Sequence, residues 1–181
     1  FGAKFKSKNK NNLPIKILGS EFLKPINYFE TRGSAQCKSA VILAALNTPG
    51  MTKINAKKSR NHTELFLKYL NLPLKIKNKK TCDVIEVHGE NQFKSFDYEI
   101  PGDISSSSFF IVLTLLIKNS KLKIRNVNVN PSRIGFIKII NRMGANVKFI
   151  NKRNVCGEEL ADICVNSQKH LKSINCPIKF N

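Results

Sequence analysis

The sequence predicts an α/β fold assembled from repeated units of the order β-α-β-α-β-β. The same order of six segments can be traced twice along the 181 residues. The landmarks of the two copies also keep their spacing: Gly33 and Gly102 are 69 residues apart, and the Ser-Arg pairs that begin at Ser59 and Ser132 are 73 apart. An internal repeat constrains the whole fold, so both copies are expected to share one architecture.

The first copy begins at about Asn27. We expect a strand there, a turn at Gly33, helices at 35–46 and 61–70, and strands at 52–56, 74–77 and 83–88. The helical stretch 40–46 is apolar nearly all round, which predicts burial. Asn61 and Glu64 have the spacing of a capping box, in which each side chain bonds a free backbone N–H of the first turn.

The second copy repeats this order. We expect strands at 96–100, 121–127, 146–150 and about 160–165, with helices at 105–118 and 134–143. Gly144 suits the position after a helix end, where the backbone needs a positive φ. Ahead of the first copy, residues 2–6 and 14–18 resemble the last two strands of an earlier unit.

The composition is strongly basic. A hydrophobic fraction of 41% is enough for a packed core, and 31 Lys and Arg against 12 Asp and Glu give a formal net charge of +19. Such a charge is typical of polyanion binders. However, lysine is scattered through all elements together with Asn and Ile, and no arginines interleave with aromatic residues to stack bases. We therefore expect no specific nucleic-acid partner; a basic nucleic-acid-binding module, with steeply salt-dependent affinity, remains the non-enzyme alternative.

Cysteine and hydropathy patterns predict neither metal nor membrane. The five cysteines form no C-x-x-C pair, and the three histidines show no ligand spacing, so no metal or cofactor is expected. The longest apolar run, 109–117, is too short for a span, which needs roughly 20 residues. The predicted location is the cytoplasm. Because the chain starts at Phe1 and stops in a polar stretch, we expect an internal piece of a longer protein.

Two turns of the first copy predict an anion site. Ser34, Ala35 and Gln36 open an apolar helix, whose free N–H groups and positive dipole end favour phosphate or carboxylate. Taken alone, Ser34 is better explained as a simple helix cap. Ser59 and Arg60 open the next helix, after a strand expected to run parallel to the first. Because parallel strand ends line up, the two turns should converge, with Arg60 completing an anion cage.

Four strings in this order carry a family resemblance: Gly33-Ser-Ala-Gln-Cys-Lys-Ser-Ala40, Lys58-Ser-Arg-Asn-His-Thr-Glu64, Pro101-Gly-Asp-Ile-Ser-Ser-Ser-Ser-Phe-Phe110, and Asn130-Pro-Ser-Arg-Ile-Gly135 with Arg142-Met-Gly-Ala145. In order and spacing they resemble blocks of the 5-enolpyruvylshikimate-3-phosphate synthase family, a transferase family of the shikimate pathway of aromatic amino-acid biosynthesis. They cover essentially the whole chain. Asn61 stands where the family usually has Asp.

The resemblance implies a fold of the inside-out barrel type, with two domains of three βαβαββ units each and the active site between them. It places a domain boundary near Pro101, so that residues 1–100 and 101–181 belong to different domains. It implies transfer of the enolpyruvyl group of phosphoenolpyruvate to the 5-hydroxyl of shikimate 3-phosphate by a protein that is monomeric when complete. The related UDP-N-acetylglucosamine enolpyruvyl transferase is the alternative, and the first two strings argue against it.

The resemblance also implies roles for single residues. Ser34 and the Ala35 position would hold the phosphate of shikimate 3-phosphate, and Arg60 with Ser59 would close on it. Gln36 would reach both the shikimate ring and the enolpyruvyl group of phosphoenolpyruvate. Asp103 is expected to cap a helix. The family's catalytic residues have no counterpart in these 181 residues, so we expect the chain alone to be inactive.

Overall fold

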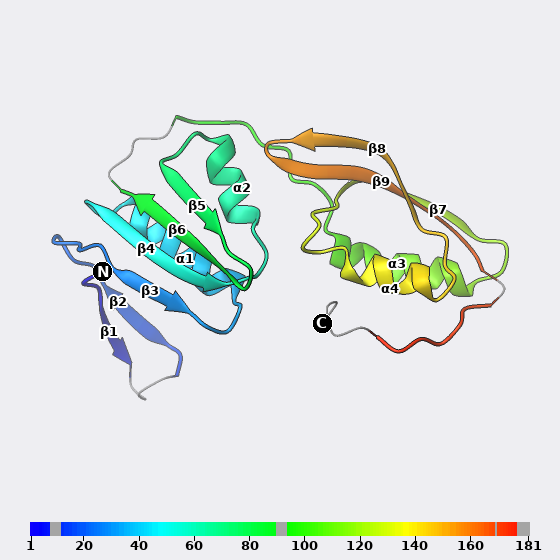
Figure 1. Ribbon diagram of the computed structural model, residues 1–181, viewed down its shortest axis with the longest axis horizontal. Coiled ribbons are helices and arrows are strands. Elements are labelled where there is room, and N and C mark those ends of the chain that lie inside the picture. Colours follow the sequence, from blue (N-terminus) through cyan, green and yellow to red (C-terminus); the bar gives the residue numbers. More distant parts are fainter. Residues whose placement is uncertain (8–11, 90–93, 169, 177–181) are drawn as a thin grey trace. The chain divides into compact units, whose positions relative to one another are not determined.

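The structure is a computed structural model that describes residues 1–7, 12–89, 94–168 and 170–176. The chain divides into two compact units, Phe1–Ser95 and Phe96–Asn181. Figure 1 labels the helices and strands of each. Both units combine a sheet with two helices, which confirms the predicted α/β class.

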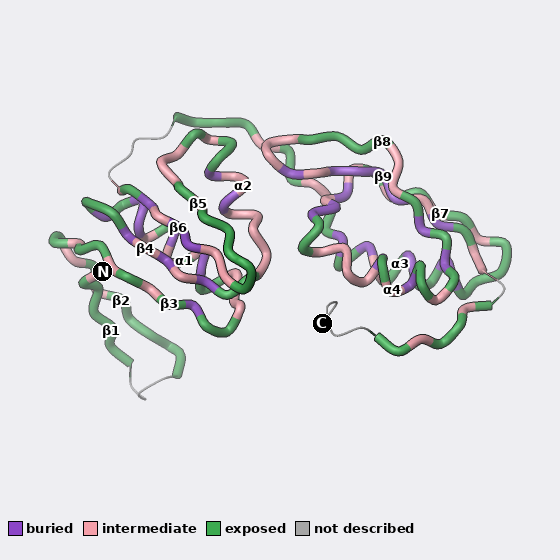
Figure 2. The backbone as a smooth tube through the Cα atoms, viewed as in Figure 1, coloured by how far each residue is buried: buried purple, intermediate pink, exposed green. Residues whose placement is uncertain are grey.

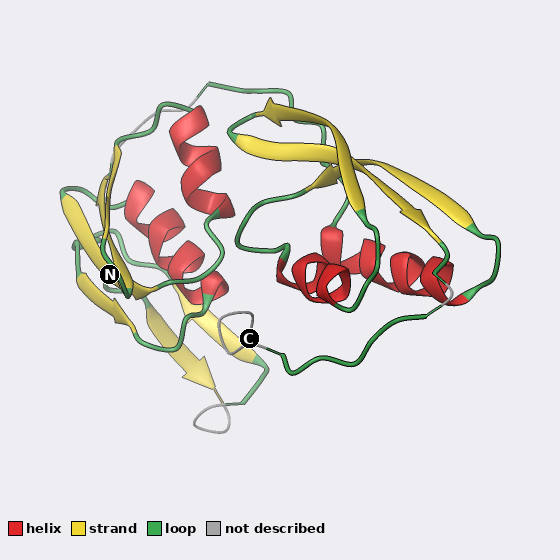
Figure 3. Cartoon of the chain, turned by 45° about the vertical axis from the view of Figure 1, so that its right-hand side comes forward, coloured by secondary structure: helices red, strands yellow, loops and turns green. Residues whose placement is uncertain are grey.

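The first unit contains a hairpin and one complete repeat. The hairpin pairs β1 (Lys4–Ser7) with β2 (Ile15–Leu18) in antiparallel fashion, as expected for the end of an earlier unit. The repeat forms a sheet in the order β3-β4-β6-β5, made of β3 (Asn27–Glu30), β4 (Met51–Lys57), β5 (Leu74–Asn78) and β6 (Cys82–His88). β3 and β4 run parallel, as predicted, while the other pairs are antiparallel. Helices α1 (Ala35–Leu46) and α2 (His62–Tyr69) lie on one face of this sheet (Figure 3).

The core of the first unit lies between α1 and the sheet. Ile42 and Ala45 of α1 pack in one buried cluster with Ile54 of β4 and Ile85 of β6. Figure 2 colours the backbone by burial, with buried stretches in α1, β4 and β6. The expectation that the apolar helix is buried all round is wrong for its outer face, where the Leu43 side chain is 53% exposed. The reason is that the sheet covers only one side of α1 within this unit.

The second unit repeats the arrangement with three strands. Its sheet has the antiparallel order β7-β9-β8, formed by β7 (Lys121–Asn128), β8 (Lys148–Val155) and β9 (Glu158–Asn166). Helices α3 (Ile104–Leu116) and α4 (Gly135–Arg142) accompany it. Ile111, Leu115, Ile137 and Ile163 are central to its core. The starts of α1 and α3 are 69 residues apart and the starts of α2 and α4 are 73 apart, which are the predicted offsets.

The strand expected at 96–100 is absent, and this prediction is wrong. Only Gly102 forms a parallel bridge, to Val127 of β7. A β-bulge shifts the register of β7 between Ile124 and Val127, with Asn126 at φ 55°. The Asn126 side chain also donates to Glu99 at 3.1 Å. Because the bulge interrupts the edge to which this strand would pair, the segment follows β7 without forming a ladder.

Asp162 joins the bulges on both sides of β9. Its carboxylate accepts hydrogen bonds from the Asn126 backbone N–H at 3.1 Å and the Asn151 amide at 3.0 Å, and pairs with Lys123 at 3.2 Å. Asn151 has a φ of 51° at the second bulge. These contacts, the Asn126 N–H foremost, lower the pKa of Asp162 to about 2 against the opposing effect of burial.

Two helix ends test the local predictions. Gly144 has a φ of 99° directly after the end of α4, which confirms the predicted end signal. The capping box at α2 is wrong, because the Asn61 side chain makes no capping hydrogen bond to the helix. Glu64 is instead buried and pairs with Lys38 of α1. Glu64 thus pairs with Lys38 on the other helix and not with the start of its own helix.

Candidate functional site

The turn before α1 is held by a buried carboxylate. Glu30 accepts the backbone N–H groups of Arg32 at 3.0 Å and Gly33 at 2.7 Å. Burial by itself would raise the pKa of Glu30, but these bonds, a further N–H from Ser34 and the charge of Lys38 together lower it. Gly33 adopts a φ of 78°, which a residue with a side chain rarely takes. The start of α1 is therefore held in place by hydrogen bonds within the chain.

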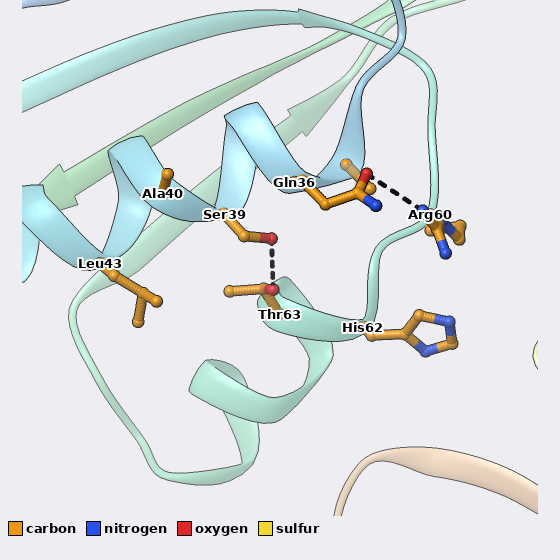
Figure 4. A pocket seen from close by; sticks show the side chains of 8 residues that line it. Gln36, Ser39, Ala40, Leu43, Arg60, His62 and Thr63 are labelled. Atoms are coloured by element: carbon orange, nitrogen blue, oxygen red, sulfur yellow. Dashed lines mark hydrogen bonds between the residues drawn. The ribbon is translucent and has the colours of Figure 1, made fainter. Parts of the chain in front are cut away.

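The beginnings of α1 and α2 converge, as predicted. The Arg60 guanidinium donates from Nη2 to Gln36 Oε1 at 3.1 Å. One turn further along both helices, the Ser39 and Thr63 hydroxyls lie 2.7 Å apart (Figure 4). The parallel pairing of β3 and β4 explains this, because it delivers both following turns to the same edge of the sheet.

A buried ion pair lies behind this contact. Lys38 of α1 is 0% exposed, and its Nζ pairs with Glu64 Oε1 of α2 at 2.5 Å. The same Nζ donates to the backbone carbonyl oxygen of Arg60 at 2.8 Å. The two helices are thus joined by charge beneath the surface as well as by hydrogen bonds at the surface.

A cavity of about 430 Å³ opens between the two helix starts. Three of the five predicted site residues line it, namely Ala35, Gln36 and Arg60. Ser34 is not among the lining residues; its hydroxyl accepts the Cys37 N–H at 3.2 Å and so caps α1. Ser59 does not line the cavity either, and its hydroxyl oxygen is buried with no hydrogen-bond partner among the described residues.

Sequence reasoning missed four side chains of this site. Ser39, His62 and Thr63 line the cavity, and Lys38 supports it from below. A lysine inside an otherwise apolar helix was the available signal for Lys38, because buried lysines require a charged partner. The three polar residues lie one helical turn or less from predicted ones, so helical spacing could have located them.

The second unit places a carboxylate where the first has a hydroxyl. Asp103, at the repeat position of Ser34, caps α3 by accepting the Ser106 N–H at 2.9 Å. Arg133, at the position of Arg60, donates to Asp103 Oδ1 at 3.1 Å and to Ser105. The Ser106 N–H, followed by further hydrogen bonds and the Arg133 charge, lowers the pKa of Asp103 against the effect of burial. The expectation that Asp103 caps a helix is confirmed.

Arg60 differs from Arg133 in its charge balance. Arg133 is neutralised by Asp103 within its own unit. Across the part of the chain that the structure describes, no carboxylate pairs with Arg60, whose recorded side-chain partner is the neutral Gln36 amide. Two helix N-termini and an unbalanced guanidinium therefore meet at one cavity, an arrangement that favours an anion.

Within the described ranges, no three His, Cys, Asp or Glu side chains gather as metal ligands would. None of the helices described has the length and apolar character needed to cross a membrane.

Comparison with known proteins supplies the family. The sequence profile of EPSP synthase (3-phosphoshikimate 1-carboxyvinyltransferase) matches residues 1–179. Relatives named 3-phosphoshikimate 1-carboxyvinyltransferase from Zymomonas mobilis and Petrotoga mobilis are 38% and 42% identical, over 97% and 92% of this chain. The chain spans only 39% and 38% of the lengths of these two proteins.

A solved structure agrees with the sequence relatives. EPSP synthase from Acinetobacter baumannii superposes with a TM-score of 0.82 at 31% identity, covering 99% of this chain and 40% of that one. Sequence similarity and structural similarity thus indicate the same family over almost the whole chain. The chain belongs to the EPSP synthase (3-phosphoshikimate 1-carboxyvinyltransferase) family.

Proposed function

We propose that this chain is part of an enzyme that transfers the enolpyruvyl group of phosphoenolpyruvate to the 5-hydroxyl of shikimate 3-phosphate. Family membership and the names of the relatives support the proposal. The observation that carries it is Arg60, whose charge is unbalanced at the mouth of a cavity between two helix starts. Shikimate 3-phosphate carries a phosphate that such a site can hold with charge-assisted hydrogen bonds.

Each predicted residue has a defined part in this proposal. The phosphate sits at the start of α1, against Ser34 and the Ala35 N–H, and Arg60 supplies the neutralising charge. Ser59 joins it through a change of side-chain rotamer, because its hydroxyl is enclosed in the present structure. No residue of this chain is assigned the proton transfers of the reaction.

Gln36 has a fixed orientation that suits its proposed role. Arginine has only donors, so the Gln36 oxygen must face Arg60 and the amide NH₂ must turn away. Figure 4 shows this amide at the edge of the cavity, close to Arg60. Its two N–H donors are then available to a ring hydroxyl of shikimate 3-phosphate and to the enolpyruvyl group.

The complete enzyme is proposed to be a cytoplasmic monomer without a specific nucleic-acid partner. Its two domains would be joined near Pro101, so that residues 1–100 and 101–181 belong to different domains. The compact units of the structure divide a few residues earlier, between Ser95 and Phe96.

The first prediction tests Arg60 against its repeat counterpart. In the complete protein, Arg60→Gln should weaken shikimate 3-phosphate binding roughly 10- to 100-fold, since hydrogen bonds to charged groups contribute about 1.5–3 kcal/mol. Isothermal titration calorimetry measures the affinity. Arg133→Gln is the matched control and should change the affinity less than about twofold, because Asp103 already neutralises Arg133.

Two results would contradict the proposal. Equal losses from the two arginine substitutions would show that Arg60 has no special role. Stabilisation of the complete protein by UDP-N-acetylglucosamine, but not by shikimate 3-phosphate, in a thermal-shift assay would favour the related transferase instead.

A further inference from the structure

Lys38 is a buried cation that has no part in the proposed reaction. Its side chain is 1% exposed, and its ammonium has two recorded partners, Glu64 Oε1 and the Arg60 carbonyl oxygen. Burying an ammonium group is costly unless it is paired and hydrogen-bonded, so a lysine at this position requires a reason. A ligand cannot be that reason directly, because the ammonium is closed off from the cavity surface.

Arg60 is held by α1 at two points. Lys38 binds its backbone carbonyl at 2.8 Å, and Gln36 binds its guanidinium at 3.1 Å. These two α1 residues are two positions apart, so a single rigid turn fixes both ends of the arginine. Glu64 lies one turn after Arg60 on α2 and ties that helix to the same ammonium. The backbone from which Arg60 projects is thereby locked to the start of α1.

The second unit shows that the fold does not need this ion pair. At the repeat positions of Lys38 and Glu64 it has Ser107 and Ile137, both buried. The Ser107 hydroxyl bonds the Asp103 carbonyl of its own helix, and Ile137 packs in the apolar core. The same helix pair therefore forms without a buried charge. The ion pair occurs in the unit whose arginine has no carboxylate partner among the described residues.

We propose that Lys38 is a positioning residue that holds Arg60 in place for anion binding. The inference rests on the proposed function of Arg60. Without a carboxylate to orient it, as Asp103 orients Arg133, the Arg60 guanidinium depends on its backbone and on Gln36 for its geometry. Lys38 fixes that backbone, so the site is formed before the anion enters, and less ordering is required on binding.

The test replaces the ion pair by apolar residues in the complete protein. Lys38→Met/Glu64→Ile takes the isoleucine of the second unit at position 64 and a side chain of similar volume at position 38, and exchanging a buried ion pair for apolar side chains of similar volume often preserves folding. We expect a thermal midpoint within a few degrees of the original. The affinity for shikimate 3-phosphate, measured by calorimetry, should fall about tenfold through the less ordered Arg60.

Coupling to Arg60 separates positioning from a general structural effect. If Lys38 acts through Arg60, adding Arg60→Gln to the double variant should cost clearly less affinity than Arg60→Gln alone. Losses that simply multiply would overturn the inference, as would wild-type affinity in a folded double variant. Lys123→Met, which breaks the pair with Asp162 in the second unit, is the control and should leave the affinity unchanged.

Two further outcomes remain decisive. If Lys38→Met/Glu64→Ile does not fold, Lys38→Met/Glu64→Gln serves instead, because it removes both charges and the Lys38 bond to the Arg60 carbonyl but keeps a polar side chain at position 64. A fall of about tenfold in affinity supports positioning by Lys38, whereas affinity within about twofold of the original overturns it. If Arg60→Gln alone has no effect, the proposed role of Arg60 fails first, and this result is distinct from a failure at Lys38.

Discussion

The residue that caps the start of each long helix, α1 or α3, determines whether the charge of the neighbouring arginine is neutralised within the unit. Ser34 and Asp103 both cap their helices by accepting the N–H three residues later. Only Asp103 carries a charge, and it forms an ion pair with Arg133. The same backbone therefore carries an Arg–Asp ion pair in one unit, whereas in the other the described residues give the arginine only the neutral Gln36 amide as a side-chain partner.

Ser34→Asp should close the proposed anion site. An aspartate caps a helix as well as serine, so α1 should remain folded, while its carboxylate occupies the place proposed for the phosphate. We expect at least a tenfold loss of shikimate 3-phosphate affinity in the complete protein, measured by calorimetry, with an unchanged urea midpoint. Ser34→Asn, which caps without a charge, is the control. If both variants bind equally well, the phosphate does not sit at Ser34.

At the scale of elements, the ionised Asp162 carboxylate connects β9 to both of its neighbouring strands. Asp162 joins the bulges at Asn126 and Asn151, on the two strands that flank β9. Its pKa of about 2 lies below the ordinary value of 3.8, so the unfolded chain takes up the proton first as the pH falls. The contribution of Asp162 to the free energy of unfolding is therefore full above pH 3.8 and is lost as the pH falls through about 2.

Asp162→Asn should flatten the acid dependence of stability. Urea midpoints measured from about pH 6 to pH 2 should fall less steeply for the variant, because the amide has no proton to take up. Glu159→Gln is the control on the same strand, since its pair with Lys152 is largely exposed and contributes little. Identical slopes for Asp162→Asn and the unchanged protein would show that the carboxylate does not hold the bulges.

Sequence predicts those elements whose ends carry local signals. The predicted and observed bounds of α1 coincide at 35–46, because Ser34 caps its start and Pro49 with Gly50 follows its end. The strand expected at 96–100 has the right alternation of residues. It fails because its partner strand β7 is bulged at Asn126, and no property of 96–100 itself reports that bulge.

The candidate site also combines contacts that the sequence predicts with contacts that it does not. The convergence of the Gln36 and Arg60 turns is predictable, because parallel strands deliver consecutive turns to one sheet edge. The Lys38–Glu64 pair is not, because it depends on how α1 and α2 are rotated against each other. Local spacing instead assigned Glu64 to a capping box at Asn61, which the structure contradicts.

For the molecule as a whole, the internal repeat places Arg60 and Arg133 at matching positions of two similar units. The two units keep the same helix pairs, although the second sheet has one strand fewer, and they differ at the capping, buried and arginine-pairing positions. Each unit thus acts as a structural control for the other. The chain spans 39% and 40% of the lengths of two of its relatives.

The 181-residue chain alone should release no phosphate from shikimate 3-phosphate and phosphoenolpyruvate. The proposed reaction needs groups that move protons and a second set of cations for phosphoenolpyruvate, whereas the cavity lining includes Arg60 and no carboxylate. A colorimetric phosphate assay measures the product, with the complete protein as positive control. Turnover by the chain at a rate near that of the complete protein would contradict this expectation.

Among the described residues, no carboxylate neutralises the Arg60 guanidinium, and this has a practical consequence for handling the protein. When no substrate is present, we expect small dianions from the buffer to bind at the Arg60 guanidinium. Sulfate or inorganic phosphate at millimolar concentration should therefore compete in titrations and raise the melting temperature, whereas chloride should do neither. Apparent affinities measured in phosphate-buffered saline would then understate the true ones, so an amine or zwitterionic buffer is the appropriate medium.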